Sequence, residues 1–294
     1  MNRFFLLTLS LFFPLSMMGQ LPFQKTDVKD VMKKVADWQI AHQKDVKHGA
    51  LDWTNAALYM GMLDWAELAE TEMGDASYYD WLVKLGRRYG WQPDKRMYHA
   101  DDIAVGQVFI DLYNKYKDKN MLYPTQARAE WVVNHPSDGP MDLDYKKRET
   151  LERWTWCDAL YMAPPVYVKL YMLTGDKRFI KFMNKEYKAT YDLLFDKDER
   201  LFYRDSRYLT QKEANGAKVF WGRGNGWVLG GLAEMLQDFP KNDKNRKFYE
   251  ELFVTLSARV AELQSADGFW HASMLDPASY PSPETSATGF IVYA

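Results

Sequence analysis

The chain has 294 residues, 47% of them hydrophobic, which is enough for one large core or two smaller domains. Its formal net charge is −2, and no run rich in lysine or arginine occurs, which argues against nucleic acid or an anionic membrane as the main partner. Aromatic residues make up 16% of the chain, a surplus that suits a sugar-binding cleft, although a tryptophan-rich helical core is the alternative.

The N-terminus is predicted to be a signal peptide over residues 1–19. Arg3 provides a positive start, and the 15 residues from Phe4 to Met18 are almost wholly apolar. Such a run is shorter than the roughly 20 residues that span a bilayer, so export and cleavage are favoured over anchoring. No cysteine follows the run, which argues against a lipid anchor, and the single Cys157 cannot form an internal disulfide. We therefore expect a periplasmic or secreted protein that begins near Gln20 and has no membrane anchor.

Helical periodicity dominates from about Val28 onward. The stretches WTNAALYMGMLDWAELAE and PVYVKLYMLTG repeat apolar residues three and four positions apart. Gly-Asp pairs at Gly74-Asp75 and Gly175-Asp176 can end one helix and cap the next. Strand patterns are scarce, and RLFYRDSRYL is the best candidate for a short hairpin element. The pattern predicts an all-α protein built from helical hairpins.

No linker or low-complexity tract divides the chain, so we expect one domain over residues 20–294. Long loops rich in Trp, Gly and Pro separate the hairpins, which favours a closed α/α toroid over an open solenoid. The chain ends in ETSATGFIVYA, an apolar helix-forming run without a cap or a polar tail. A toroid of six hairpins usually needs more residues, so we expect the domain to be incomplete at its C-terminus.

Polar residues stand among aromatic ones in several segments. In RWTWCDALYMAPP, Asp158 is either a buried acid that caps a helix or a catalytic acid whose pKa desolvation raises. In MYHADDIAVGQ, the adjacent Asp101 and Asp102 could serve a helix start, and His99 alone could be a structural histidine. Together with Asp158, these acids resemble the paired carboxyl groups of a glycosidase.

Other chemistries have little support in the sequence. It contains no HExxH or clustered Cys/His pattern and no G-x-S-x-G elbow. The segment GRGNGW is glycine-rich but lacks the G-x-G-x-x-G spacing of a phosphate-binding loop. We therefore expect neither a metal site nor a cofactor.

Four motifs in order, HADD, WTWCDALYMAPP, FWGRGNGW and SMLDPASYPSPETSATGF, resemble those of the unsaturated rhamnogalacturonyl hydrolases, glycoside hydrolase family 105. The similarity covers Asp27 to Ala294. It implies an (α/α)6 barrel with a pocket at one end. It also implies removal of 4,5-unsaturated galacturonic acid from the non-reducing end of lyase-generated rhamnogalacturonan and pectin oligosaccharides, by hydration of the C4=C5 enol ether.

The resemblance also assigns residues. Asp158 matches the general acid/base, and Asp101 or Asp102 matches the second pocket carboxylate, a choice that the motif leaves open. An arginine can bind the ring carboxylate through a forked pair of hydrogen bonds, and a tryptophan can stack on the flattened ring. The expected substrate-binding residues are Trp221, Arg223, Trp227, His99, Trp156, Arg204 and Tyr203. Several family members carry a histidine near the short hairpin element, where this chain has Tyr203, Arg204 and Asp205.

Alternative functions remain open at the level of the sequence. The same fold and logic serve the related unsaturated glucuronyl hydrolases of family 88, which act on glycosaminoglycan fragments. Another α/α-toroid activity, an inverting glycosidase or an epimerase, is a second alternative, although an epimerase pocket needs several histidines and the whole chain has five. A glycan-binding protein without catalytic activity is a third alternative. Such a protein would tolerate loss of the candidate acids, but all of them are present.

Overall fold

The computed structural model describes residues 24–294. The predicted signal peptide, residues 1–19, and the expected mature start at Gln20 lie outside this range. The chain divides into two compact units after Asp45. In its described part, the first unit contains helix α1 (Lys25–His42) and the 3-10 turn η1 (Gln43–Asp45). The second unit, Val46–Ala294, holds every feature discussed below.

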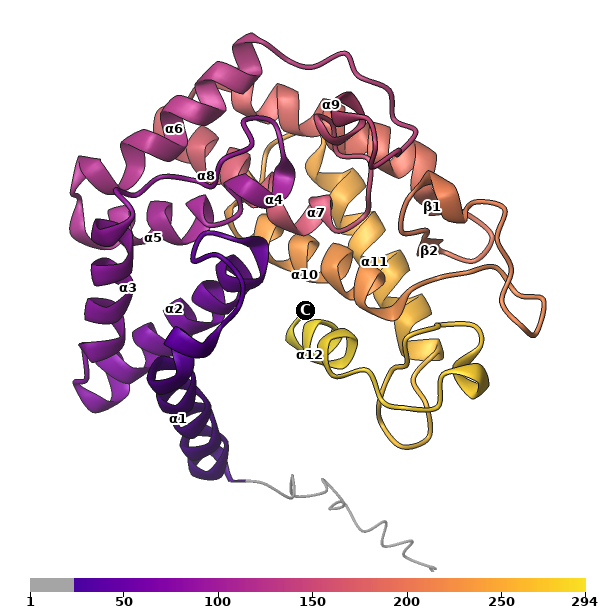
Figure 1. The fold of residues 1–294 in the computed structure, drawn as a ribbon, viewed down its shortest axis with the longest axis horizontal. Helices are drawn as coiled ribbons and strands as arrows, with labels where there is room; N and C mark the ends of the chain where they lie inside the picture. The colour runs from indigo at the N-terminus through magenta and orange to yellow at the C-terminus, as the bar shows by residue number, and fades with distance from the viewer. Residues whose placement is uncertain (1–23) are drawn as a thin grey trace, which may run out of the picture. The chain divides into compact units, whose positions relative to one another are not determined.

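The second unit is built almost entirely from helices (Figure 1). In chain order its helices and strands are α2 (Trp53–Met73), α3 (Ser77–Arg88), α4 (Ala100–Ile103), α5 (Gly106–Tyr116), α6 (Lys119–Asn134), η2 (Arg148–Leu151), α7 (Ala159–Met162), α8 (Pro164–Thr174), α9 (Lys177–Leu194), β1 (Phe195–Asp196), β2 (Leu201–Phe202), η3 (Ser206–Tyr208), α10 (Gly222–Asp238), α11 (Arg246–Glu262), η4 (Pro277–Ser279) and α12 (Thr285–Tyr293).

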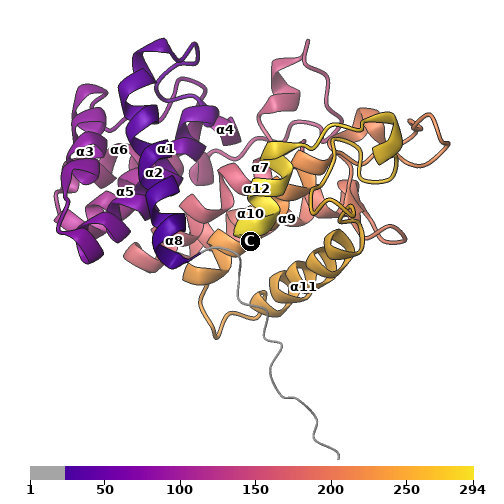
Figure 2. The same ribbon diagram turned by 90° about the horizontal axis from the view of Figure 1, so that it is seen from below.

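Four helical hairpins follow one another in this unit. Helix α2 packs against α3, α5 against α6, α8 against α9, and α10 against α11. The first helix of each hairpin also contacts the first helix of the next, and α10 packs closely against α12 (Figures 1 and 2). The helices α2, α5, α8, α10 and α12 therefore form an inner layer, with α3, α6, α9 and α11 outside it. The predicted helical-hairpin architecture is confirmed.

The hairpin turns use the residues that the sequence singled out. Gly74 ends α2 with φ 69°, and Gly175 ends α8 with φ 71°, a left-handed conformation that glycine adopts without strain. Asp176 then caps α9 by accepting a hydrogen bond of 2.9 Å from the Arg178 amide. Asp118 caps α6 in the same way, so each turn reverses the chain within a few residues.

Close backbone packing joins α10 to the short helix α7. A Cβ atom on Gly231 would lie 2.3 Å from the carbonyl oxygen of Leu160, so only glycine fits there. The buried Gln107 of α5 donates hydrogen bonds of 3.1 and 3.0 Å to the carbonyl oxygens of Tyr161 and Met162. These contacts hold α7 and the residue before it, Asp158, in a fixed place in the inner layer.

The short hairpin element is smaller than the sequence pattern predicts. Strand β2 covers Leu201–Phe202, pairs antiparallel with β1, and is followed by the turn η3 instead of continuing to Leu209. The Asn225 side chain of α10 accepts a hydrogen bond of 2.8 Å from the Phe202 amide and donates one of 3.1 Å to the Phe202 carbonyl. The hairpin is thereby fixed to α10, which places Arg204 beside the inner layer. Among residues 24–294, no helix is both long and apolar enough to cross a membrane.

Candidate active site

A cavity of about 250 Å³ opens where the starts of α2, α4 and α7 meet. Asp52 and Trp53 stand at the N-terminus of the long helix α2, whose partial positive charge favours anionic groups, while α4 and α7 are single turns. The residues that line the cavity are Asp52, Trp53, Arg96, His99, Asp101, Tyr145, Leu151, Trp156, Asp158, Met162 and Arg204. Polar groups thus converge between tryptophan faces, as sugar recognition requires.

Three carboxyl groups, those of Asp52, Asp101 and Asp158, line this cavity, and Asp52 is already used as the N-cap of α2. Burial raises the pKa of Asp158, while the positive charges of Arg204 and Arg223 oppose that rise. Burial, and next the negative charge of Asp158, raise the pKa of Asp101 to about 8. The Oδ1 atom of Asp101 is buried and has no hydrogen-bond partner among the described residues. At neutral pH the cavity therefore holds a protonated Asp101 beside Asp158, whose own pKa burial also raises.

The structure separates the two adjacent acids of HADD. Asp102 is 2% exposed and does not line the cavity. Its carboxylate accepts hydrogen bonds from Arg96, 2.9 Å from the side-chain Nε and 2.7 Å from the main-chain amide. Asp102 is therefore committed to fixing Arg96 and the segment before α4. Asp101 is the member of the pair that faces Asp158.

His99 forms part of the cavity wall. Its Nδ1 atom accepts a hydrogen bond of 3.3 Å from the Asp101 amide, which caps α4, and its ring lies 4.7 Å from the ring of Trp156. Burial, and next the charge of Arg96, lower the pKa of His99 to about 4. A neutral imidazole at physiological pH can orient Asp101 and present a face to a sugar.

Arg204 belongs to this cavity and to a second one beside it. Its guanidinium donates to the Tyr145 hydroxyl at 2.8 Å and to the fully buried Asp205 at 2.5 Å. Burial disfavours the charge of Arg204, but the hydrogen bond to Tyr145 and the nearby Asp158 outweigh it and raise the pKa of Arg204. The Arg204 carbonyl accepts a hydrogen bond of 2.8 Å from the Cys157 amide, which ties the hairpin to the start of α7.

The second cavity has a volume of about 360 Å³ and contains Trp221 and Arg223. The Arg223 guanidinium lies 4.3 Å from the centroid of the Trp221 ring. These two residues were expected in the same pocket as Asp158, but they line the adjoining cavity instead. The two cavities meet at Arg204.

Two of the expected substrate-binding residues lie in the core, and this corrects the sequence interpretation. Trp227 is 2% exposed and packs against Tyr161 and Phe290, with its ring centroid 3.9 Å from that of Phe290. Tyr203 is 6% exposed, stacks on Phe220 and donates a hydrogen bond of 2.9 Å to Asp196. Neither side chain lines either cavity, because Trp227 packs among aromatic residues of the inner layer and the Tyr203 hydroxyl is directed to Asp196 of β1.

Several lining residues were absent from the sequence-based assignment. Asp52 accepts a hydrogen bond of 3.0 Å from the Thr54 amide and caps α2, while Trp53 begins that helix. Their position at the start of the inner helix α2 was the sequence feature that could have identified them as lining residues. Tyr145 comes from the long segment between α6 and η2, where no periodicity marks it, and Arg96 is recognised only through its contact with Asp102.

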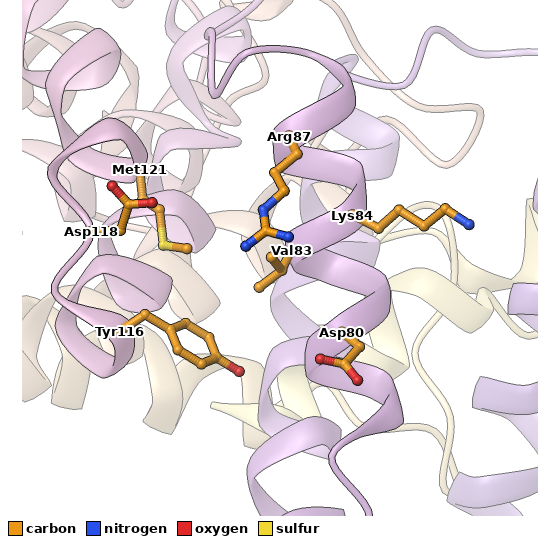
Figure 3. Close-up of a pocket in the computed structure, with 7 residues that line it drawn as sticks. All are labelled: Asp80, Val83, Lys84, Arg87, Tyr116, Asp118 and Met121. Atoms are coloured by element: carbon orange, nitrogen blue, oxygen red, sulfur yellow. The ribbon is translucent and has the colours of Figure 1, made fainter.

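A larger hollow of about 460 Å³ lies between α3 and the α5–α6 turn (Figure 3). Arg87 of α3 extends into it toward the segment that carries Tyr116 and Asp118. Asp118 is already used as the N-cap of α6, and Asp80 on α3 is exposed to water. Within the described residues, no group of three or more metal-ligating side chains occurs. The cavity with Asp101 and Asp158 is therefore the best candidate for an active site.

Comparisons with known proteins identify the family of this chain. The family model described as Glycosyl Hydrolase Family 88 matches residues 31–294. A Formosa agariphila protein named unsaturated 3S-rhamnoglycuronyl hydrolase is 36% identical, over 95% of this chain and 75% of its own length. An Alteromonas protein (strain LOR) of the same name is 30% identical, over 93% of this chain and 70% of its own.

Solved structures share the fold. One that is named a polysaccharide lyase has a TM-score of 0.80 and 30% identity, over 91% of this chain and 75% of that one. A family 105 glycoside hydrolase of C. acetobutylicum has a TM-score of 0.71 and 21% identity, over 89% of this chain and 74% of that one. With these neighbours the predicted (α/α)6 barrel class is confirmed.

Proposed function

We propose a function for this chain, which belongs to glycosyl hydrolase family 88. It removes a 4,5-unsaturated uronic acid from the non-reducing end of rhamnose-containing oligosaccharides. The observation that carries the proposal is the pair Asp101 and Asp158 in one cavity beside Arg204. The cavity volume of about 250 Å³ lies just below the range of roughly 300–1,000 Å³ for pockets of drug-sized ligands, which suits a single sugar ring. Its tryptophans offer faces for a flattened ring, and Arg204 offers a partner for the ring carboxylate.

In the proposed reaction, Asp158 delivers a proton to C4 and a water molecule adds at C5. The resulting carboxylate takes a proton from the attacking water, so Asp158 ends the step protonated. The product is a hemiketal whose ring opens and releases the rest of the oligosaccharide as an alcohol. Asp101, protonated at neutral pH, adds no second negative charge to the cavity and can donate a hydrogen bond to the substrate.

The identity of the leaving sugar is the finer part of the proposal. The sequence resemblance predicts rhamnogalacturonan as the source, and the two relatives above are named for rhamnoglycuronyl substrates. Elimination across C4 and C5 removes both stereocentres, so galacturonate and glucuronate yield the same unsaturated ring. The motif resemblance and the names of the two relatives both include rhamnose, so we propose rhamnose as the leaving sugar.

Substitution of Asp158 by Asn tests the proposal, because Asn keeps the shape of the side chain and cannot exchange the proton. Turnover of an unsaturated uronyl-rhamnose disaccharide should fall by about two to four orders of magnitude, while substrate binding is retained. The measurement is the loss of ultraviolet absorbance of the enol ether, with binding followed by calorimetry. Asp142→Asn serves as the control, since this nearby acid binds Ser206 and lines neither cavity.

The isotope content of the product separates the mechanisms. In heavy water the wild-type enzyme should place deuterium at C4, because that proton comes from the enzyme and not from the sugar. A product without deuterium at C4 would point to direct cleavage of the glycosidic bond. A gain of absorbance from an intact polysaccharide would indicate a lyase, the activity for which one of the structural neighbours is named.

A further inference from the structure

The Arg204 guanidinium is held by two groups from different parts of the chain, Tyr145 and Asp205. We infer that Tyr145 is a positioning residue for the proposed reaction. Together with the buried Asp205 it fixes the Arg204 guanidinium in the reaction cavity, and it acts on catalysis through that arginine. This inference rests on the proposed function and adds to it a residue that the sequence pattern did not indicate.

Asp205 is the fixed anchor of this arrangement. It has no solvent exposure, so its negative charge has to be balanced inside the protein. Its Oδ2 atom accepts hydrogen bonds of 2.5 Å from Arg204 and 2.9 Å from Arg207. Its Oδ1 atom accepts bonds of 2.8 Å from the Arg207 side chain and 3.1 Å from the Arg207 amide. Both oxygens are thus engaged, which leaves the carboxylate little freedom to move.

The main chain ties this anchor to the candidate catalytic acid. Trp156 and Asp205 form an antiparallel bridge, and the Cys157 amide donates a hydrogen bond of 2.8 Å to the Arg204 carbonyl. Asp158 follows directly on Cys157, so the backbone positions of Arg204 and Asp158 are coupled. The long arginine side chain has many rotamers, however, so the backbone alone does not fix its guanidinium.

Tyr145 holds the guanidinium from a second side. It comes from the segment between α6 and η2, and its hydroxyl accepts a hydrogen bond of 2.8 Å from Nη2 of Arg204. The Arg207 guanidinium lies 4.5 Å from the centroid of the Tyr145 ring and so supports the ring. Asp205 binds Nη1 of Arg204, so the planar guanidinium is held at both terminal nitrogens.

A fixed guanidinium matters to the proposed reaction in two ways. Burial raises the pKa of Asp158, and the charge of Arg204 is the strongest influence in the opposite direction. This influence falls with distance, so it depends on where the guanidinium is held. The donors of Arg204 that neither partner uses are also held in one orientation toward a substrate oxygen. Loss of the Tyr145 hydroxyl should weaken both effects.

A double-mutant cycle tests whether Tyr145 acts through Arg204. Tyr145→Phe keeps the ring, and the side chain is 51% exposed, so the variant should fold. It should lower kcat/KM for an unsaturated uronyl-rhamnose disaccharide by roughly 10-fold, the effect of misplacing a charged hydrogen-bond donor. Arg204→Gln should lose about 10- to 100-fold. In that background Tyr145→Phe should cost less than about twofold, because the group that it positions is gone.

The pH profile of kcat/KM is a readout that a loss of stability would not move. The proposed reaction needs protonated Asp158, so activity falls as the pH rises through the pKa of that group. A displaced Arg204 lowers this pKa less. The alkaline limb should therefore move to higher pH in Tyr145→Phe, and further in Arg204→Gln. Both variants leave unchanged the other charged or ionisable groups around Asp158, which are Asp52, Arg96, His99, Asp101 and Arg223.

Tyr98→Phe is the matched control. The Tyr98 hydroxyl donates a hydrogen bond of 2.8 Å to the His135 carbonyl, at the start of the segment that carries Tyr145. Tyr98 lines neither cavity. Its variant removes a hydroxyl that fastens the same segment without touching Arg204, so it should keep the wild-type kcat/KM and pH profile.

The outcomes separate the inference from the proposed function. Equal losses from Tyr145→Phe in the wild-type and Arg204→Gln backgrounds would show that Tyr145 acts on its own and would overturn the inference. Wild-type kcat/KM in Tyr145→Phe, an unshifted pH profile, or the same changes in Tyr98→Phe would also overturn it. Each of these results leaves the proposed function standing. If the wild-type enzyme releases no unsaturated uronate from the disaccharide, the proposed function itself fails.

Discussion

Replacing Asp101 by Asn should make the protein more stable, and the gain should grow with pH. The folded state raises the pKa of Asp101 to about 8 from an ordinary value of 3.8. Between these two values, the folded protein keeps the Asp101 proton while the unfolded chain releases it. The unfolded state is therefore favoured as the pH rises, and the wild-type protein loses stability across this window. Asn carries no proton to release, so the variant escapes this loss.

The magnitude follows from the width of the window. Each pH unit inside it changes the free energy of unfolding by about 1.4 kcal/mol. Between pH 5 and pH 8 the stability difference between variant and wild type should therefore grow by about 3 to 4 kcal/mol. Below pH 4 the difference should be small, because both states hold the proton there.

Urea-induced unfolding of both proteins at pH 5, 6.5 and 8 measures this difference, since groups that do not interact with Asp101 titrate alike in both proteins. Asp102→Asn is a matched control from the adjacent position. It removes the carboxylate that binds Arg96, so it should destabilise the protein at all three pH values, by about 1–3 kcal/mol, which is less than for a fully buried pair because the Arg96 side chain is 54% exposed. Parallel stability curves for wild type and Asp101→Asn would refute the claim that Asp101 is protonated in the folded protein.

Two further predictions concern packing around the site. Gly231→Ala should lower the free energy of unfolding by about 1–3 kcal/mol, because its Cβ would lie 2.3 Å from the Leu160 carbonyl oxygen. Gly230→Ala is the control and should be tolerated, since the closest contact of its Cβ would be 3.5 Å. Thermal unfolding of the two variants measures the difference. Trp227→Phe should cost about 1 kcal/mol of stability and leave KM near the wild-type value, since the Trp227 indole nitrogen has no hydrogen-bond partner among the described residues. A large selective rise in KM would return Trp227 to the substrate pocket.

The sequence alone was sufficient for the fold class, and it proposed the residues of the candidate site. Apolar spacing of three and four residues predicted the helices, and the Gly-Asp pairs predicted two of the hairpin turns, because local conformational preferences decide both. Asp158 was recognised as a candidate because a carboxyl group among aromatic residues is costly to bury, so it is expected to have a structural or catalytic role. The resemblance of the four ordered motifs to a known hydrolase family then indicated the type of reaction.

Tertiary contacts decided which neighbouring residues face the cavity. Asp101 and Asp102 are adjacent in one motif, and only the folded position of Arg96 shows that Asp102 is engaged and Asp101 is not. Trp221 and Trp227 also share a motif. Trp221 is the N-cap of α10, with φ −82° and ψ 126°, so its side chain lies outside the helix, while Trp227 sits in the helix and turns into the core. Side-chain direction depends on such helix boundaries and on distant partners, which a motif does not encode.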